Sequence, residues 1–297
     1  WSERGTRPEF DLVTGVSTGS LIAPFVFVGR DYDAKLAEIF IKYSGEDIYQ
    51  ANVLSGLLGG AAVADNAPLA RLIDSYVDRR LLARVAAERS NGRVLLIGTT
   101  NLNAQRPVFW DMGKIAQAGT PRALDLFRKV LLASAALPGI FPPVHIEVTA
   151  NGQTFHEMHV DGGPTREVFF SPDQFNFGMI DEAVGRSIKR RLWIVRNGKL
   201  APEYAVVQET ALAVAARSLE TLTKSQGIGD LIRMHDKAER DGIDYNLAYV
   251  PASFSAPRPA PFARSYMQPL YAVGYRLGNA GAPWAKSPPG LEVAAKR

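Results

Sequence analysis

A serine near the start of the chain has the spacing of a catalytic nucleophile. The pentapeptide GVSTG, residues 15–19, places Ser17 between Gly15 and Gly19, after one apolar run and before another. A strand-to-helix turn this sharp leaves no room for side chains at the flanking positions, so we expect glycine to be required at both. The pattern predicts an exposed, activated serine; the alternative is a serine that caps a helix in an ordinary turn.

The helix expected after Ser17 would supply the other half of an acyl-transfer site. Its first backbone N–H groups, beginning with that of Thr18, lie at the positive end of the helix dipole. Such donors stabilise the negative charge that develops on a substrate carbonyl oxygen. The sequence therefore indicates cleavage of an acyl bond by a serine, which also requires a base nearby.

One aspartate stands where a sheet enzyme would place that base. If FHEMHVDGG, residues 155–163, forms a strand, Asp161 lies at its end. Gly162 and Gly163 follow and allow another backbone segment to approach closely. Functional side chains of α/β proteins gather at strand ends of this kind. We expect Asp161 to be the base; an aspartate in a plain Asp-Gly turn is the alternative.

The histidines do not predict a metal site. His156 and His159 are three residues apart on an expected strand, so their side chains point to opposite faces. The zinc-protease pattern instead needs two histidines four apart on a helix. We expect neither a metal nor a cofactor. His145 and His235 are isolated, and each is either a surface or core histidine or the third member of a Ser-Asp-His triad. The chain order of a triad with His235 would be allowed.

Composition narrows the classes of protein that remain. The 297 residues are 46% hydrophobic and 22% charged, enough for a large core. A net charge of +4 is too small and too scattered to predict nucleic-acid binding. The absence of cysteine excludes disulfides, thiolate metal sites and a cysteine nucleophile. No apolar run reaches the length of a membrane span, and no signal peptide is evident. Oligomeric state and location, whether cytoplasmic, periplasmic or secreted, stay open.

Strands and helices alternate along the chain, which predicts an α/β sheet with helices packed on it. Apolar runs predict strands at 10–14, 93–99, 107–111, 144–148, 154–160, 191–195 and 245–250. Helical spacing predicts helices at 18–28, 31–43, 68–77, 80–88 and 122–136, and mostly helix between the last two strands. Asn151-Gly152 predicts a hairpin turn. The glycine-rich segment 54–64 is either a packed loop or a lid, and no linker interrupts a single domain.

Two further segments have apolar or basic character. ASAALPGIFPP, residues 133–143, reads as a helix end followed by a stiff loop, or as a wall for an acyl chain built from Pro138, Phe141 and Pro142. The chain's last part reads either as a packed tail or as a surface for anionic lipid. The residues that suggest a lipid surface are Phe254, Arg258, Phe262, Arg264 and Tyr266.

Four blocks, in matching order and spacing, resemble the patatin-like phospholipase family between residues 10 and about 200. GVSTG is similar to its nucleophile elbow, and TTNL with PVF, at 99–102 and 107–109, to its middle strand pair. Ala133-Ser134 with the prolines and phenylalanine up to Pro143 is similar to its A-S-x-x-x-P-x-x-F-P-P block, and Asp161-Gly162-Gly163 to its Asp-Gly-Gly block. The resemblance implies a three-layer α/β/α fold with a central, mostly parallel sheet. Because no linker is evident, we expect one domain, 1–297, with a catalytic core to about residue 200 and a mainly helical extension after it.

The resemblance also implies a mechanism. Ser17 would attack the ester of a lipid and form an acyl-enzyme, and Asp161 would be its general base without a catalytic histidine. An aspartate with a pKa near 3.9 is a weak base, so burial must raise that pKa. The expected partners are a lipid or other acyl ester and, at the periphery, a membrane. The alternatives are a triad esterase that uses His235 and a lipid-binding module without catalysis.

One departure from the family concerns the oxyanion hole. The family carries a glycine-rich loop upstream of the elbow, and this sequence begins after the corresponding position. We therefore expect a fragment that retains the Thr18 N–H but lacks the glycine-rich donors. The loss of one such donor costs roughly 10²–10³ in rate, so we expect weak activity from the fragment.

Overall fold

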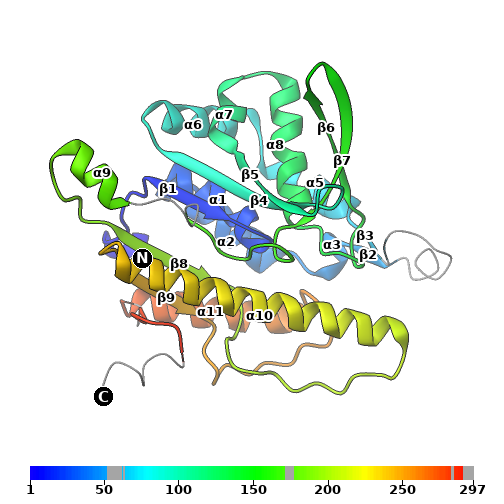
Figure 1. Ribbon diagram of the computed structural model, residues 1–297. Coiled ribbons are helices and arrows are strands. Elements are labelled where there is room, and N and C mark those ends of the chain that lie inside the picture. The colour runs from blue at the N-terminus through cyan, green and yellow to red at the C-terminus, as the bar shows by residue number, and fades with distance from the viewer. Residues whose placement is uncertain (52–61, 63, 171–176, 282–283, 290–297) are drawn as a thin grey trace. The chain divides into compact units, whose positions relative to one another are not determined.

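Contacts divide the chain into two units, whose elements Figure 1 labels. The computed structural model describes residues 1–51, 62, 64–170, 177–281 and 284–289. The N-terminal unit comprises Ser2–Glu167 and Ala256–Ala272, and the C-terminal unit comprises Trp1, Val168–Ser255 and Val273–Arg297. The main segment of the first unit runs to Glu167, and the strand at 191–196 pairs within the second unit. The expected catalytic core to about residue 200 stays a prediction. That the two units form one domain stays a prediction.

A five-stranded sheet organises the N-terminal unit around β4 (Val94–Asn101). β1 (Leu12–Gly15) pairs with β4 in parallel, and β5 (Arg106–Asp111) pairs with it in antiparallel orientation. β7 (Gln153–Asp161) is antiparallel to both β4 and β6 (Val144–Ala150). The α/β class with flanking helices is confirmed. The β4–β5 and β6–β7 pairs are antiparallel because the short turns after β4 and β6 join only antiparallel neighbours.

Helices flank this sheet, and the ones expected from apolar spacing are present. They are α1 (Thr18–Val28), α2 (Asp33–Lys42), α3 (Gly45–Ile48), α5 (Ala67–Tyr76), α6 (Arg79–Ser90), α7 (Met112–Gln117) and α8 (Pro121–Ser134). Short pieces complete the unit: η1 (Ser2–Arg4), η2 (Arg30–Tyr32), β2 (Gln50–Ala51) and β3 (Ala64–Asp65). Helix α6 begins at Asp78, whose carboxylate accepts the Leu81 N–H at 2.7 Å. Helix α8 begins at Thr120, whose hydroxyl accepts the Ala123 N–H at 3.1 Å. Such caps fix where each helix starts.

The core of this unit lies between the sheet and the helices α1, α6 and α8. Its largest fully buried side chains include Phe27, Leu81, Leu95, Ile97 and Phe127. Each such side chain stabilises the fold by about 1.5–3 kcal/mol on burial.

The predicted hairpin is also confirmed: Asn151 and Gly152, with φ of 51° and 76°, connect β6 to β7 in the manner of a type I′ turn.

The C-terminal unit has a small parallel sheet and a long helix. β8 (Arg191–Arg196) pairs with β9 (Asp244–Tyr249), and α10 (Ala211–Arg240) packs on β9. Helix α9 (Phe177–Val184) also belongs to this unit, whereas α11 (Arg264–Asn279) is divided between the units at residues 272 and 273. Strands near β8 and β9 are expected from the sequence, whereas α11 is not, because Pro269 and scattered aromatics conceal its spacing.

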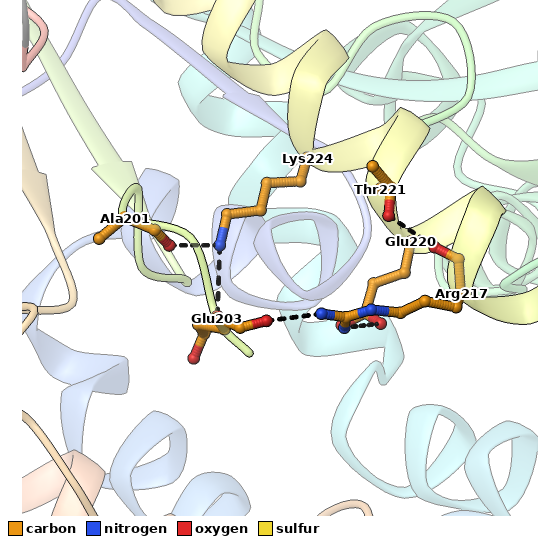
Figure 2. Close-up of polar contacts among 6 residues, drawn as sticks. All are labelled: Ala201, Glu203, Arg217, Glu220, Thr221 and Lys224. Atoms are coloured by element: carbon orange, nitrogen blue, oxygen red, sulfur yellow. Dashed lines mark hydrogen bonds and ion pairs between the residues drawn. The ribbon is translucent and has the colours of Figure 1, made fainter. Parts of the chain in front are cut away.

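Side chains of α10 anchor the segment that precedes it, as Figure 2 shows. The Lys224 ammonium donates to the Ala201 carbonyl at 2.6 Å, and the Arg217 guanidinium donates to the Glu203 carbonyl at 2.6 Å. Arg217 also pairs with Glu220, one turn further along the helix, at 2.6 Å. These charge-assisted bonds hold the otherwise irregular residues before α10 against the helix.

The structure tests only part of what the sequence predicts for the glycine-rich segment and the tail. Most of the glycine-rich segment 54–64 lies outside them, so its role stays open. Every described helix is too short or too polar to cross a lipid bilayer. In the tail, Phe254 is buried and Phe262 packs on Tyr49 with ring centroids 6.5 Å apart, which favours the packed-tail reading for these two aromatics.

Candidate active site

The register of the sheet brings the ends of β1 and β7 to one edge of β4. Gly15 pairs with Ile97 of β4, and Asp161 pairs with Thr99, two residues further along. Strand β5 pairs with residues 96–101 along the other edge of β4, so β1 and β7 must share the remaining edge. The two strands therefore meet end to end, which places Asp161 beside the turn that carries Ser17.

Ser17 lies in a strained turn between β1 and α1. Its φ of 54° and ψ of −130° are unusual for a residue other than glycine, and strain of this kind concentrates at functional sites. Although Ser17 occupies the N-cap position, its side chain caps none of the described N–H groups of α1. This geometry matches a nucleophile elbow and argues against a capping serine.

The two glycines that flank Ser17 are not equivalent. A Cβ atom on Gly15 would lie 2.5 Å from the Gly19 carbonyl oxygen and 2.9 Å from Ala23 Cβ. A Cβ atom on Gly19 would meet nothing within 4 Å. The expectation that both positions exclude side chains is therefore correct for Gly15 and wrong for Gly19. The reason is that Gly19 lies in the open first turn of α1, whereas Gly15 lies beneath it.

Asp161 is buried to 1% exposure at the end of β7. Its Oδ1 atom accepts the Gly163 N–H at 2.8 Å, whereas Oδ2 makes no hydrogen bond of standard geometry to the described residues. Burial raises the pKa of the carboxyl to about 6, and the Ser17 hydroxyl and the Gly163 N–H oppose that rise. Ser17 thus lies near Asp161, in a contact looser than a standard hydrogen bond, as is common in ligand-free active sites.

The end of α8 contacts both of these residues. The Ser134 hydroxyl accepts the Ser17 N–H at 3.1 Å and donates to the Gly98 carbonyl at 2.7 Å. Two residues later, the Ala136 carbonyl accepts the Asp161 N–H at 2.9 Å. Ser134 is completely buried. One helix end therefore fixes the backbone of the serine and of the aspartate at the same time.

The glycine after Asp161 allows this close packing. A Cβ atom on Gly162 would lie 2.8 Å from Val16 Cγ1 and 2.9 Å from the Gly98 carbonyl oxygen. The expected close approach at Gly162 is present, and its partner is the residue before Ser17. Gly163 supports the site through its N–H, which binds the Asp161 carboxylate and is thereby not directed at a substrate.

A buried polar chain supports the same strand end. The Trp110 N–H donates to Thr99 Oγ1 at 2.9 Å, and Thr99 Oγ1 lies 3.0 Å from His159 Nδ1. Because Thr99 accepts from Trp110, its own proton is free for Nδ1, and His159 Nε2–H then donates to Glu157 at 3.1 Å. Burial lowers the pKa of His159, which favours the neutral form of this histidine, whereas Glu157 opposes that shift. His159 is thus a structural residue beside Asp161.

Sequence reasoning missed two parts of the site. Ser134 belongs to a block that resembles the family, but the sequence does not predict its hydrogen bonds. Its spacing was informative, because it follows Phe127, Val130 and Leu131 on the buried face of α8. A small polar residue on such a face must find a buried partner. The Thr99 network left no comparable local signal.

The acyl-wall candidates separate by exposure. Phe141 is 4% exposed and packs on Tyr49 with ring centroids 6.2 Å apart, so it belongs to the interior. Pro138 and Pro142 are half-buried. The exposed apolar side chains of this loop are Leu137 and Ile140. An acyl wall in this loop stays a prediction, and only its unburied members are accessible.

His235, the candidate triad histidine, lies on α10 of the C-terminal unit. Its ring packs against Tyr245 with centroids 5.1 Å apart, and its Nδ1 makes no hydrogen bond to the described residues. His235, Asp236 and Glu239 present ligand atoms within 4.8 Å of one another, and they are the described group that could hold a metal ion. Both carboxylates are exposed, and nothing further marks a metal site there.

Comparison with known proteins identifies the family. The model of the patatin-like phospholipase family matches residues 3–171, which is more than half of the chain. The chain belongs to the patatin-like phospholipase family. No curated protein matches it.

The patatin-like region contains the whole arrangement described above. Ser17, Ser134 and Asp161 all lie within residues 3–171, as do the five strands of the larger sheet. Membership places the chain among lipid acyl hydrolases, whose substrates are lipids or related esters. The residues after 171, which include α10 and β9, lie outside the matched region.

Proposed function

We propose that this patatin-like protein hydrolyses acyl esters of phospholipids or related lipids through a Ser17–Asp161 dyad. The observation that supports the proposal most directly is a strained serine turn beside a buried carboxyl with a raised pKa. A pKa of about 6 suits a general base near neutral pH, since the group is largely ionised there and still accepts a proton effectively.

The proposed reaction has two steps. Ser17 Oγ attacks the ester carbonyl carbon while Asp161 takes the hydroxyl proton; the intermediate then collapses, the ester C–O bond breaks, and the leaving alcohol receives that proton. A water molecule next attacks the acyl-enzyme and gives a proton to Asp161. The Ser17–acyl bond breaks, Ser17 regains the proton, and the fatty acid leaves.

Backbone donors near Ser17 would stabilise the oxyanion. The first N–H groups of α1, those of Thr18 and Gly19, have no partner within the helix. The Ser17 N–H is bound to Ser134 and the Gly163 N–H to Asp161, so neither is directed at the substrate. The start of α1 is therefore the proposed part of the oxyanion hole within the described site.

The experiment is covalent labelling combined with hydrolysis. A fluorophosphonate should label Ser17, and Ser17→Ala should abolish both labelling and release of fatty acid from a phospholipid substrate. Asp161→Asn should reduce both by at least about 10², the lower bound for loss of general-base catalysis. His235→Ala is the control, and the dyad predicts that it keeps substantial activity. Labelling that persists in Ser17→Ala, or activity that is lost in His235→Ala, would contradict the proposal.

A further inference from the structure

A basic pocket in the N-terminal unit lies apart from the residues of the dyad. It has a volume of about 140 Å³ and is lined by Asp31, Tyr32, Lys35, Arg80 and Arg84. The four charged residues are exposed, whereas Tyr32 is buried. Since one water molecule needs only about 10–15 Å³, the pocket has room for a tetrahedral oxyanion. Three cationic side chains and one carboxylate line the pocket.

None of these three cations forms an ion pair with the described carboxylates. Several guanidinium groups elsewhere in the unit do form such pairs. The matched pairs include Arg7–Asp33 at 2.6 Å, Arg89–Asp111 at 3.2 Å, Arg93–Glu88 at 3.0 Å and Arg128–Asp74 at 3.3 Å. Lys35 instead lies over the Tyr32 ring, with Nζ 5.5 Å from the centroid. The pocket therefore brings three positive charges together with a single carboxylate.

The carboxylates close in sequence to the pocket have other partners. Asp33 binds Arg7, and Glu38 binds Lys42 at 2.9 Å. Asp78 caps the start of α6 through the Leu81 N–H. Asp31 is thus the one carboxylate among the lining residues. An anion from solution would meet little competition for Lys35, Arg80 and Arg84.

The geometry of α6 favours one class of anion. Arg80 and Arg84 are one turn apart, so both guanidinium groups lie on the same side of the helix and repel each other. An anion between them removes this repulsion. Guanidinium groups bind phosphate oxygens in pairs, and a lysine adds a compact third charge.

We propose that this pocket binds a phosphate group, carried by a soluble phosphate compound or by the headgroup of a lipid. The proposal goes beyond the dyad, because no residue of the pocket belongs to the Ser17–Asp161 site. It predicts that inorganic phosphate binds the full chain and that the double variant Arg80→Gln/Arg84→Gln binds it about tenfold more weakly or worse.

Calorimetric titration with inorganic phosphate measures the pocket directly. Sedimentation with phosphatidylcholine vesicles, with or without phosphatidic acid, measures lipid phosphate in the Ser17→Ala background, where hydrolysis cannot intervene. Hydrolysis of a soluble short-chain ester should be unchanged in Arg80→Gln/Arg84→Gln, and its melting curve checks that it is folded.

Two variants separate the pocket from general surface charge. Arg71→Gln/Arg79→Gln removes the same charge from exposed positions of α5 and α6 that do not line the pocket, and it should bind phosphate normally. Asp31→Asn removes the opposing carboxylate and should bind phosphate more tightly, a gain that structural damage would not produce.

The outcomes are distinct. Binding of both phosphate and phosphatidic acid vesicles, lost only in the pocket variant, supports a lipid headgroup as the ligand. Binding of phosphate without vesicle binding supports a soluble phosphate ligand. If wild-type chain does not bind phosphate, or if both double variants lose binding equally, the proposal is overturned. Neither result bears on labelling of Ser17, so the two proposals fail independently.

Discussion

At the scale of single residues, the burial of Asp161 affects the stability and the chemistry of the protein in opposite ways. Its burial raises the pKa to about 6, so the folded state favours the protonated carboxyl. Because the folded pKa exceeds the unfolded one, the contribution of Asp161 to stability is fully present below about pH 4 and is lost as pH rises through 6. At neutral pH the protein therefore holds an ionised carboxylate at a cost of about 3 kcal/mol.

The pH dependence of hydrolysis should report this carboxyl. We expect kcat/KM to rise with pH and to level above about pH 6, because the proposed base acts only when it is deprotonated. A pH-rate profile with a soluble ester measures the ascending limb. If kcat/KM instead rises around pH 3.9, the ordinary aspartate pKa, the result would contradict a raised pKa at the base.

Unfolding of Asp161→Asn is the control for this assignment. The variant should be more stable than wild type above pH 6, by up to about 3 kcal/mol, and equally stable below about pH 4. His159 acts in the opposite direction: burial lowers its pKa, so its contribution is lost as pH falls. The difference between the two proteins therefore isolates Asp161, since His159 is common to both.

At the scale of elements, the site depends on how closely β1, α1 and the end of α8 approach one another. Gly15 lies against the first turn of α1, and Gly162 lies against Val16. Ser134 then connects the Ser17 N–H to the Gly98 carbonyl of β4. None of these contacts involves a long side chain, so the elements have little freedom to adjust to a larger residue.

The two glycines of the elbow should respond differently to alanine. Gly15→Ala should abolish labelling of Ser17 or prevent folding, because its Cβ would lie 2.5 Å from a backbone oxygen. Gly19→Ala should be tolerated in the folded chain, since its Cβ meets nothing within 4 Å. Melting curves and fluorophosphonate labelling of the two variants test this contrast, and equal behaviour would refute the described turn.

Removal of the Ser134 hydroxyl should misplace the nucleophile. Ser134→Ala leaves the Ser17 N–H and the Gly98 carbonyl without their partner, which costs about 1–3 kcal/mol of stability. We expect kcat to fall more than KM changes, because Ser134 positions Ser17 without touching substrate. Ser75→Ala, which removes an exposed hydroxyl bound to its own helix, is the matched control. An unchanged kcat in folded Ser134→Ala would show that this bond does not position Ser17.

At the scale of the whole molecule, each unit has its own main core among the described residues. The larger surrounds Phe127 in the N-terminal unit, and the smaller surrounds Leu231 and Leu247 in the C-terminal unit. Three tryptophans of the C-terminal unit, Trp1, Trp193 and Trp284, form a cluster with ring centroids 4.8–5.2 Å apart. Trp110 is the fourth tryptophan and belongs to the other unit. Each unit therefore carries its own fluorescent reporter.

Core substitutions should destabilise the two units selectively. Leu231→Ala should lower the free energy of the unfolding transition that the tryptophan cluster reports. We expect a loss of about 2–5 kcal/mol, the usual cost of truncating a buried leucine to alanine. Phe127→Ala should lower the free energy of the unfolding transition that abolishes labelling of Ser17, by about 3–5 kcal/mol. Fluorescence and labelling are followed in parallel during urea unfolding. If each variant shifts both transitions equally, the two cores unfold as one.

Local sequence pattern determined the chemical candidates and most of the elements. GVSTG between two apolar runs predicted β1, α1 and the reactive serine, and Asn151-Gly152 predicted the hairpin that ends at Asp161. These features depend on neighbours within a few residues, so periodicity and turn chemistry reveal them. The division at residue 167 was not predicted, because it depends on contacts distant in sequence. Helix α11 was not predicted, because Pro269 and scattered aromatics conceal its spacing.

Only the tertiary structure decided how the candidates meet. The shared edge of β4 places the end of β7 beside the Ser17 turn, and the end of α8 binds the backbone of both residues. The raised pKa of Asp161 likewise comes from burial under elements far away in the chain. Strand register and burial are set by the packing of the whole unit, and the order of residues in a short segment does not specify them.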